Sequence, residues 1–89
     1  MAKRSRLDII TDMLHAIMEK NSEIKPTHLM YKSNLSHTQL NSYLEELIDK
    51  NLVNRTTKND YEYIIITDKG RHFLQKLMEM REFEKTFGI

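Results

Sequence analysis

Residues 36–51, SHTQLNSYLEELIDKN, predict the helix around which the rest of the chain is organised. Ser36 is a favourable helix N-cap, and Gln39 completes a capping box, in which each side chain bonds the backbone N–H of the other residue. Apolar residues then recur at the spacing of one helical face: Leu40, Leu44, Leu47 and Ile48. Asn51 stands at the position of a left-handed C-cap, a conformation that Asn tolerates. The sequence therefore marks both ends and the buried face of this helix.

The exposed side of this predicted helix divides into two halves. The N-terminal half carries the candidate base-contacting residues, which are polar and formally uncharged: His37, Thr38, Gln39, Asn41 and Ser42. The C-terminal half carries carboxylates: Glu45, Glu46 and Asp49. Amides and hydroxyls hydrogen-bond the edges of bases, whereas phosphates repel carboxylates. The pattern favours a helix that enters DNA by its first turns, and it is also typical of an ordinary solvated helix.

The composition limits the class of protein. The chain has 89 residues, no cysteine, and 14 Lys and Arg against 13 Asp and Glu, for a formal net charge of +1. This length suits one domain, and we expect a single domain over residues 1–89. Because no apolar run is long enough to span a membrane or to act as a signal peptide, we expect a cytoplasmic protein. The balanced charge neither requires nor excludes a nucleic-acid partner.

The segment before the central helix predicts two further helices. A capping box at Ser5 and Asp8 starts the first, and apolar residues hold helical spacing to about residue 20. Pro26 suits the first position of the second helix, because its fixed φ fits there and its missing N–H would be unpaired anyway. That short helix ends near Ser33. With the central helix after a tight polar turn, it forms a helix-turn-helix pattern.

After Asn51 the pattern changes from helical to extended. Residues 52–57 and 61–67 are rich in β-branched and aromatic residues, and the sequence Lys-Asn-Asp at 58–60 is typical of a turn. We therefore expect residues 52–67 to form a two-stranded hairpin, or wing, beside the helix-turn-helix.

A last helix is predicted over residues 68–87, with Thr67 as its N-cap. It carries two apolar stripes. The shorter stripe contains Leu74 and Met78. The longer one contains Phe73, Leu77, Met80 and Phe87. Because one small domain covers only one stripe, the other would be exposed in a monomer. We expect the longer stripe to form the interface of a homodimer.

Three segments carry a family resemblance: MYKSNLS (30–36), QLNSYLEELIDKNLV (39–53) and YIIITDKGRHFL (63–74). They resemble the archaeal winged helix-turn-helix family of predicted transcriptional regulators, which commonly shows the patterns MYKxNLSxxQLxxYLxxLxxxGL and YxLTxKGxxFL. That family includes small chromatin-type DNA-binding dimers joined through a C-terminal helix. The resemblance covers nearly the whole chain. It agrees with the predicted fold: α+β but mostly helical, with three helices, a two-strand wing and a long C-terminal helix.

The chain departs from the family pattern at two places. Asn51 stands where the family usually has Gly, and Asn can serve as the same helix cap. Asn41 and Ser42 occupy exposed helix positions where many members carry Lys or Arg. The predicted DNA-contacting helix therefore has fewer cations than in those members.

Contacts with DNA phosphates require cations near the helix-turn-helix. Six basic residues from the N-terminal arm, the second helix and the wing are candidates: Lys3, Arg4, Arg6, Lys32, Arg55 and Lys58. The sequence shows no catalytic or metal-binding constellation, since its histidines and serines lack the spacing of metal ligands or of a nucleophile with its base. We expect no enzymatic activity, no cofactor and no small-molecule ligand.

The sequence is consistent with two functions. The first is a dimeric protein that binds double-stranded DNA, either a transcriptional regulator or a nucleoid-associated architectural protein, with helix 36–51 in the major groove. The second is a winged-helix module that binds another protein and has little affinity for DNA. The low net charge and the acidic half of the central helix favour the second function. The basic candidates favour the first if they share one face of the molecule.

Overall fold

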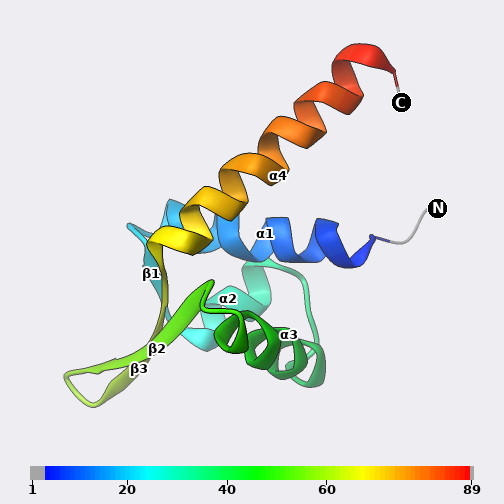
Figure 1. Ribbon diagram of the computed structural model, residues 1–89. Coiled ribbons are helices and arrows are strands. Elements are labelled where there is room, and N and C mark those ends of the chain that lie inside the picture. The colour runs from blue at the N-terminus through cyan, green and yellow to red at the C-terminus, as the bar shows by residue number, and fades with distance from the viewer. Residues whose placement is uncertain (1–3, 89) are drawn as a thin grey trace.

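The computed structural model describes residues 4–88, which form four helices and a three-stranded antiparallel sheet. The elements in chain order are α1 (Arg6–Glu19), β1 (Glu23–Ile24), α2 (Pro26–Lys32), α3 (His37–Asp49), β2 (Val53–Lys58), β3 (Tyr61–Ile66) and α4 (Asp68–Phe87). In Figure 1, α1 crosses the centre, α2 and α3 lie on one side of it, and α4 slants away on the other. This order confirms the predicted α+β winged helix-turn-helix.

The sheet has one strand more than the predicted two-strand wing. β3 is the central strand: β2 pairs with one edge of it, and β1 pairs with the other through Glu23 with Ile65 and Ile24 with Ile64. β1 has two residues, so no alternating pattern can reveal its pairing. The base of the wing is thereby joined to the connection between α1 and α2.

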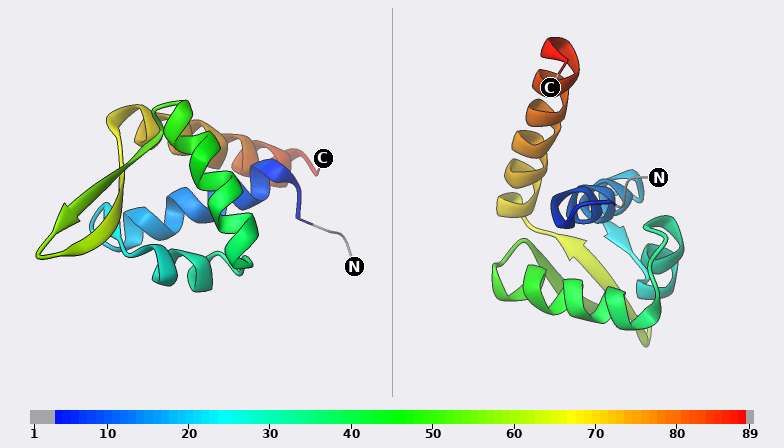
Figure 2. Two further views of the ribbon diagram at one scale, coloured as in Figure 1. Left: turned by 90° about the horizontal axis from the view of Figure 1, so that it is seen from below. Right: turned by 90° about the vertical axis from the view of Figure 1, so that its right-hand side faces the viewer.

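The turn of the hairpin is shorter than expected. Lys58 belongs to β2 and pairs with Tyr61, so the turn consists of Asn59 and Asp60, with φ of 51° and 68°. Two successive residues with positive φ match the twist of the flanking strands, and Asn and Asp adopt that conformation more readily than most residues. The hairpin therefore projects as a narrow ribbon. Its tip and the C-terminal end of α4 lie at opposite ends of the body (Figure 2).

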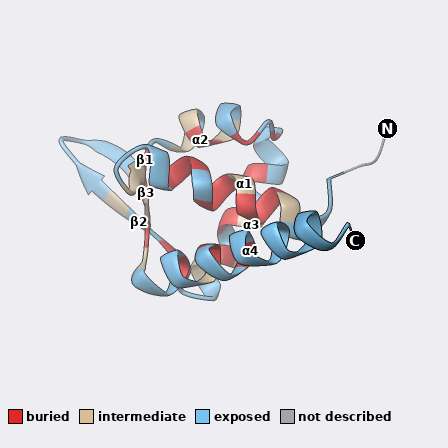
Figure 3. Cartoon of the chain, turned by 90° about the horizontal axis from the view of Figure 1, so that it is seen from above, coloured by how far each residue is buried: buried red, intermediate tan, exposed pale blue. Residues whose placement is uncertain are grey.

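The core centres on α1 rather than on α3, which the sequence marks more strongly. Seven residues of α1 are buried, against three in α3. Figure 3 shows the buried residues concentrated along α1 and on the sides of its neighbours that face it. The fully buried side chains come from five elements and include Met13, Leu14, Ile17, Leu29, Leu44, Leu47, Val53 and Ile64. α1 is thus the packing centre, and the apolar stripe of α3 faces the same core.

The start of α4 is fastened to the corner between α3 and β2. The Thr67 hydroxyl donates to the carbonyl of Asn51 (2.6 Å) and accepts from the backbone N–H of Gly70 (2.9 Å), as expected of an N-cap. A Cβ on Gly70 would lie 2.1 Å from the carbonyl oxygen of Leu52. Glycine is therefore required at this early position of α4 by the close approach of two backbones.

Candidate nucleic-acid interface

The N-terminal half of α3 is an exposed polar surface. Its capping box forms as predicted: Gln39 N donates to Ser36 Oγ (3.1 Å), and Ser36 N donates to Gln39 Oε1 (3.0 Å). All five candidate base-contacting side chains are exposed: His37, Thr38, Gln39, Asn41 and Ser42. The amide oxygen of Gln39 is engaged in the cap, so this side chain is the least free of the five to contact a partner through its oxygen.

Two of these side chains are paired, and two point outward without a partner among residues 4–88. The Asn41 amide nitrogen lies 3.3 Å from His37 Nδ1, one helical turn away. Thr38 and Ser42 face directly away from the buried stripe, and Glu45 and Asp49 continue their row along α3. The exposed surface of α3 therefore passes from uncharged to acidic along the helix, as the sequence predicts.

Within residues 4–88, the candidate phosphate-contacting residues are not free cations. Each of the five that lie within residues 4–88 has a carboxylate partner: Arg4 with Asp12, Arg6 with Glu46, Lys32 with Glu19, Arg55 with Glu62, and Lys58 with Glu23. Lys3 lies outside the described residues. The five basic side chains are between 35% and 57% exposed, and ion pairs at such exposure contribute about 1 kcal/mol or less. A phosphate can compete for such cations, but only against a carboxylate that is already in place.

The wing carries two contacts between lysines and aromatic rings. Lys58 Nζ lies 2.9 Å from Glu23 Oε1 and 5.7 Å from the centre of the Tyr63 ring. The hydrogen bond and charge of Glu23, followed by the charge of Tyr63, raise the pKa of Lys58 above its ordinary value. Lys25, which precedes α2, lies 4.2 Å from the centre of the Tyr61 ring. Within residues 4–88 no carboxylate pairs with Lys25, so the structure adds this residue to the sequence-derived candidates.

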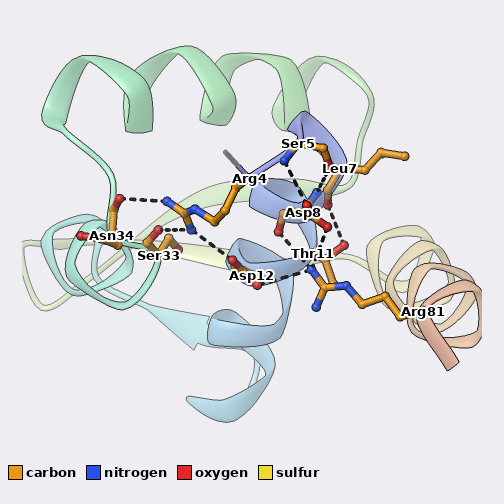
Figure 4. Close-up of polar contacts among 9 residues, drawn as sticks. All are labelled: Arg4, Ser5, Leu7, Asp8, Thr11, Asp12, Ser33, Asn34 and Arg81. Atoms are coloured by element: carbon orange, nitrogen blue, oxygen red, sulfur yellow. Dashed lines mark hydrogen bonds and ion pairs between the residues drawn. The ribbon is translucent and has the colours of Figure 1, made fainter. Parts of the chain in front are cut away.

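Arg4 turns toward the protein instead of toward solvent. Its guanidinium donates to Asp12 Oδ2 (3.0 Å) and to the carbonyls of Ser33 (2.7 Å) and Asn34 (3.0 Å), as Figure 4 shows. These partners lie 8 to 30 residues away along the chain. No local pattern in the sequence indicates them.

The exposed apolar stripe of α4 differs from the predicted one. Leu77 is only 5% exposed and belongs to the core with Leu74, and Phe73 is half-buried against the same core. The expectation that Leu77 meets a second copy is therefore corrected, because this part of α4 lies against α1. Met80 and Phe87 are exposed as the dimer prediction requires.

Phe83, which is not part of the predicted stripe, completes the exposed stripe. It is 56% exposed, and its ring centroid lies 4.7 Å from that of Phe87. The spacing of Met80, Phe83 and Phe87, at i, i+3 and i+7, was a sufficient signal to find it. From residue 78 to residue 88 every side chain is exposed.

No group of three or more His, Asp or Glu within residues 4–88 is arranged to hold a metal ion. None of the described helices has an apolar stretch long enough to cross a membrane.

Residues 3–85 match the winged helix-turn-helix family, and the chain belongs to that family. Two uncharacterized proteins of Methanocaldococcus jannaschii are similar to it: MJ0290 at 35% identity over 78 residues and MJ0287 at 31% over 80. The matches cover 88% and 90% of this chain, but 34% of MJ0290 and 76% of MJ0287. The chain thus spans about a third of the first relative and about three quarters of the second.

Solved structures share the fold. Sso10a-2, described as a DNA-binding protein from Sulfolobus solfataricus, has a TM-score of 0.82 at 21% identity, over 94% of this chain and 85% of that one. F93 from STIV, described as a winged-helix DNA-binding protein, has a TM-score of 0.76 at 20% identity, over 94% and 95%. The transcriptional regulator BldR from Sulfolobus solfataricus has a TM-score of 0.76 at 20% identity, over 90% and 60%. Identities this low show the fold alone.

Proposed function

We propose that the chain is a dimeric protein that binds double-stranded DNA, as a transcriptional regulator or an architectural chromatin protein. In this proposal α3 enters the major groove by its first turns, and the β2–β3 hairpin is the wing. The observation that carries it is the N-terminal half of α3, where five exposed polar side chains lie without a carboxylate among them. Family membership and the descriptions of Sso10a-2 and F93 as DNA-binding proteins support the same function.

Base reading in this proposal is modest. α3 carries no Arg to bond guanine, whereas the Asn41 amide can pair with the major-groove edge of adenine. Thr38 and Ser42 offer weaker and less selective contacts. We expect a preference for A·T-containing sites, with the remaining selectivity coming from DNA shape.

Asn41→Ala tests this reading. It should weaken binding to a preferred duplex by about 1–3 kcal/mol and binding to random duplex far less. Gln75→Ala, on the exposed side of α4, removes a comparable amide away from α3 and is the control. Fluorescence anisotropy on both duplexes measures the difference, and equal losses on both would show that Asn41 does not read sequence.

Contact with the DNA backbone is tested by salt dependence. Each neutralised phosphate contributes roughly −0.9 to the slope of log K against log salt concentration. Replacing Arg55 and Lys58 of the wing by Ala should therefore flatten the slope by roughly 2 per wing. A matched pair on α4, Lys76→Ala with Lys85→Ala, makes the same charge change far from the hairpin and should leave the slope unchanged. An unchanged slope in the wing variant would remove the wing from the interface.

The proposed dimer forms through the second half of α4. Residues 78–88 are exposed along their whole length, and a helix of this length has little stability in water without packing partners. The exposed side chains of Met80, Phe83 and Phe87 form an apolar stripe that a second α4 would cover. Light scattering that finds a monomer at tens of micromolar would contradict this part of the proposal.

One observation favours a protein partner instead of DNA. All five described phosphate candidates are paired with carboxylates, and the second half of α3 is acidic. The alternative function is therefore a winged-helix module that binds another protein. Counterion release makes DNA binding strongest at low salt. If the wild-type protein does not bind a mixed-sequence duplex at about 50 mM salt, that result would favour this alternative.

A further inference from the structure

A chain of charged groups connects the turn between α2 and α3 to α4 across the N-terminal half of α1 (Figure 4). Asp12 lies in the middle. One of its carboxylate oxygens accepts from Arg4 at 3.0 Å, and the other lies 3.6 Å from Arg81 of α4. Arg81 also lies 3.4 Å from Asp8 Oδ1. Two guanidinium groups, one from the segment before α1 and one from α4, thus share one carboxylate of α1.

The Arg4 end of this chain contacts the turn that sets the position of α3. Ser33 is the C-cap of α2, and Asn34 follows it with a left-handed φ of 54°. The last carbonyls of a helix lack partners within the helix, and a cation beside them is favourable for both hydrogen bonding and the helix dipole. Arg4 satisfies two carbonyls of this turn and pairs with Asp12 at the same time.

We propose that Arg4 is a positioning residue for α3, not a phosphate contact, and that Asp12 links it to Arg81 of α4. The α2–α3 turn is then held at a set position on α1 by a planar fork with three acceptors. Only the consequence for DNA affinity rests on the proposed function. The effect on the turn is expected in the protein without DNA and does not depend on that function.

The requirement for a planar fork distinguishes the two roles of Arg4. Lysine keeps the positive charge and can replace arginine at a phosphate, but its ammonium group does not reproduce the fixed geometry of a guanidinium with several acceptors. The Arg4→Lys variant therefore preserves phosphate contact and loses positioning. Arg4→Ala loses both.

The first experiment follows amide hydrogen exchange in the free protein. The backbone N–H of Leu35 donates to the carbonyl of Met30 (3.0 Å) across the turn, so its exchange rate reports on opening of the turn. We expect exchange at Leu35 to become about fivefold faster in both Arg4→Lys and Arg4→Ala. Exchange at Leu52, whose N–H donates to Leu47 at the far end of α3, should stay unchanged and excludes global destabilisation. Lys32→Ala, which removes an ion-paired cation nearby, is the matched control variant.

If the Leu35 amide of the Arg4→Lys variant exchanges at the wild-type rate, the positioning role of Arg4 is overturned. Exchange that rises equally at Leu35 and Leu52 would also overturn it, because the effect would then be on the whole domain.

The second experiment measures DNA affinity against salt. A positioning role predicts that Arg4→Lys and Arg4→Ala weaken binding to a similar extent, about fivefold, with the wild-type salt slope. A phosphate contact predicts wild-type behaviour for Arg4→Lys and a slope flatter by roughly 0.9 for Arg4→Ala, and that result would overturn the proposal. If the wild-type protein binds no DNA, the proposed function fails, and the exchange experiment still decides the role of Arg4.

The link through Asp12 has its own test. Arg81→Lys should accelerate exchange at Leu35 by about twofold, and it should have no further effect when Asp12→Asn is already present, because coupled residues are not additive. Equal effects of Arg81→Lys with and without Asp12→Asn would remove Asp12 as the link. No effect of Arg81→Lys at Leu35 would separate α4 from the turn.

Discussion

The two halves of α4 have one helical period and a similar number of apolar residues, yet only the first half is part of the core. Residues 68–77 contain three apolar side chains and residues 78–87 contain four. Leu74 and Leu77 of the first half are buried, whereas every residue of the second half is exposed (Figure 3). The difference arises because α4 diverges from α1 after the two helices cross (Figure 1). An apolar stripe thus indicates that a helix surface is favourable to bury. The position of the stripe in the fold decides whether the same chain buries it.

The largest expected effect contrasts Leu77 with Met80. Leu77→Asp places a carboxylate in the core and should lower the free energy of unfolding by about 4 kcal/mol or more. Met80→Asp introduces the same group at a side chain that is 45% exposed and should change the stability of the monomer by less than about 0.5 kcal/mol. Urea unfolding under dilute, monomeric conditions measures both. Similar losses in the two variants would mean that the halves of α4 do not differ as described.

The next effect concerns the anchor at the start of α4. Gly70→Ala puts a methyl group against the Leu52 carbonyl and should destabilise the domain by about 2 kcal/mol, because backbone has to move. Gln75→Ala, on the exposed side of the same helix, should be neutral or slightly stabilising, since Ala has the higher helix propensity. Thermal unfolding compares the two. A neutral Gly70→Ala would show that this contact does not hold α4 in place.

The third expected effect concerns the proposed dimerisation through the second half of α4. Phe83→Ala should weaken the proposed dimer by about 2 kcal/mol, because aromatic side chains in a covered apolar stripe are typical binding hot spots. The monomer should keep its unfolding free energy, since Phe83 lies outside the core. Sedimentation equilibrium measures the dissociation constant, and Lys85→Ala is the control on the same part of the helix. An unaltered dimer in Phe83→Ala would place the interface elsewhere.

The smallest expected effect is a pH dependence of the stability of the fold. It arises at Asp8 of α1, which Arg81 of α4 contacts. The backbone N–H of Ser5, then the Ser5 side chain, and then Arg81 hold the pKa of Asp8 below its ordinary value of 3.8. A depressed folded-state pKa means that Asp8 stabilises the fold above about pH 4, and that this stability is lost as the pH falls through the folded-state pKa.

The contribution of Asp8 is measured by difference. The Asp8→Asn variant should melt at a lower temperature than the wild type at pH 5. This difference in melting temperature should shrink as the pH falls to 2, because the Asp8 carboxylate of the wild type is then protonated and neither protein carries the charge. Asp60→Asn at the hairpin tip is the control. A gap that stays constant over this range would show that ionised Asp8 does not stabilise the fold.

Local chemistry made several features predictable. The capping boxes at Ser5 and Ser36 and the left-handed Asn51 all form as expected, with φ of 60° at Asn51. Each depends on residues within one or two turns of the chain, and such interactions are favourable whatever surrounds them. The order of helices and hairpin follows from the same local signals, together with hydrophobic spacing.

Contacts between distant residues were decided by the tertiary structure. The pairing of β1 with β3, the three acceptors of Arg4 and the burial of Leu77 join segments that are far apart in sequence, and no local pattern encodes which segments meet. The candidate nucleic-acid interface likewise combines features set by local sequence with contacts set by the tertiary structure. The sequence by itself determined the polar half of α3 and its exposed face, because helical spacing sets which side chains share a face. Only the tertiary structure placed carboxylates beside the cations and Arg4 against the turn, because an ion pair depends on distance in space and not along the chain.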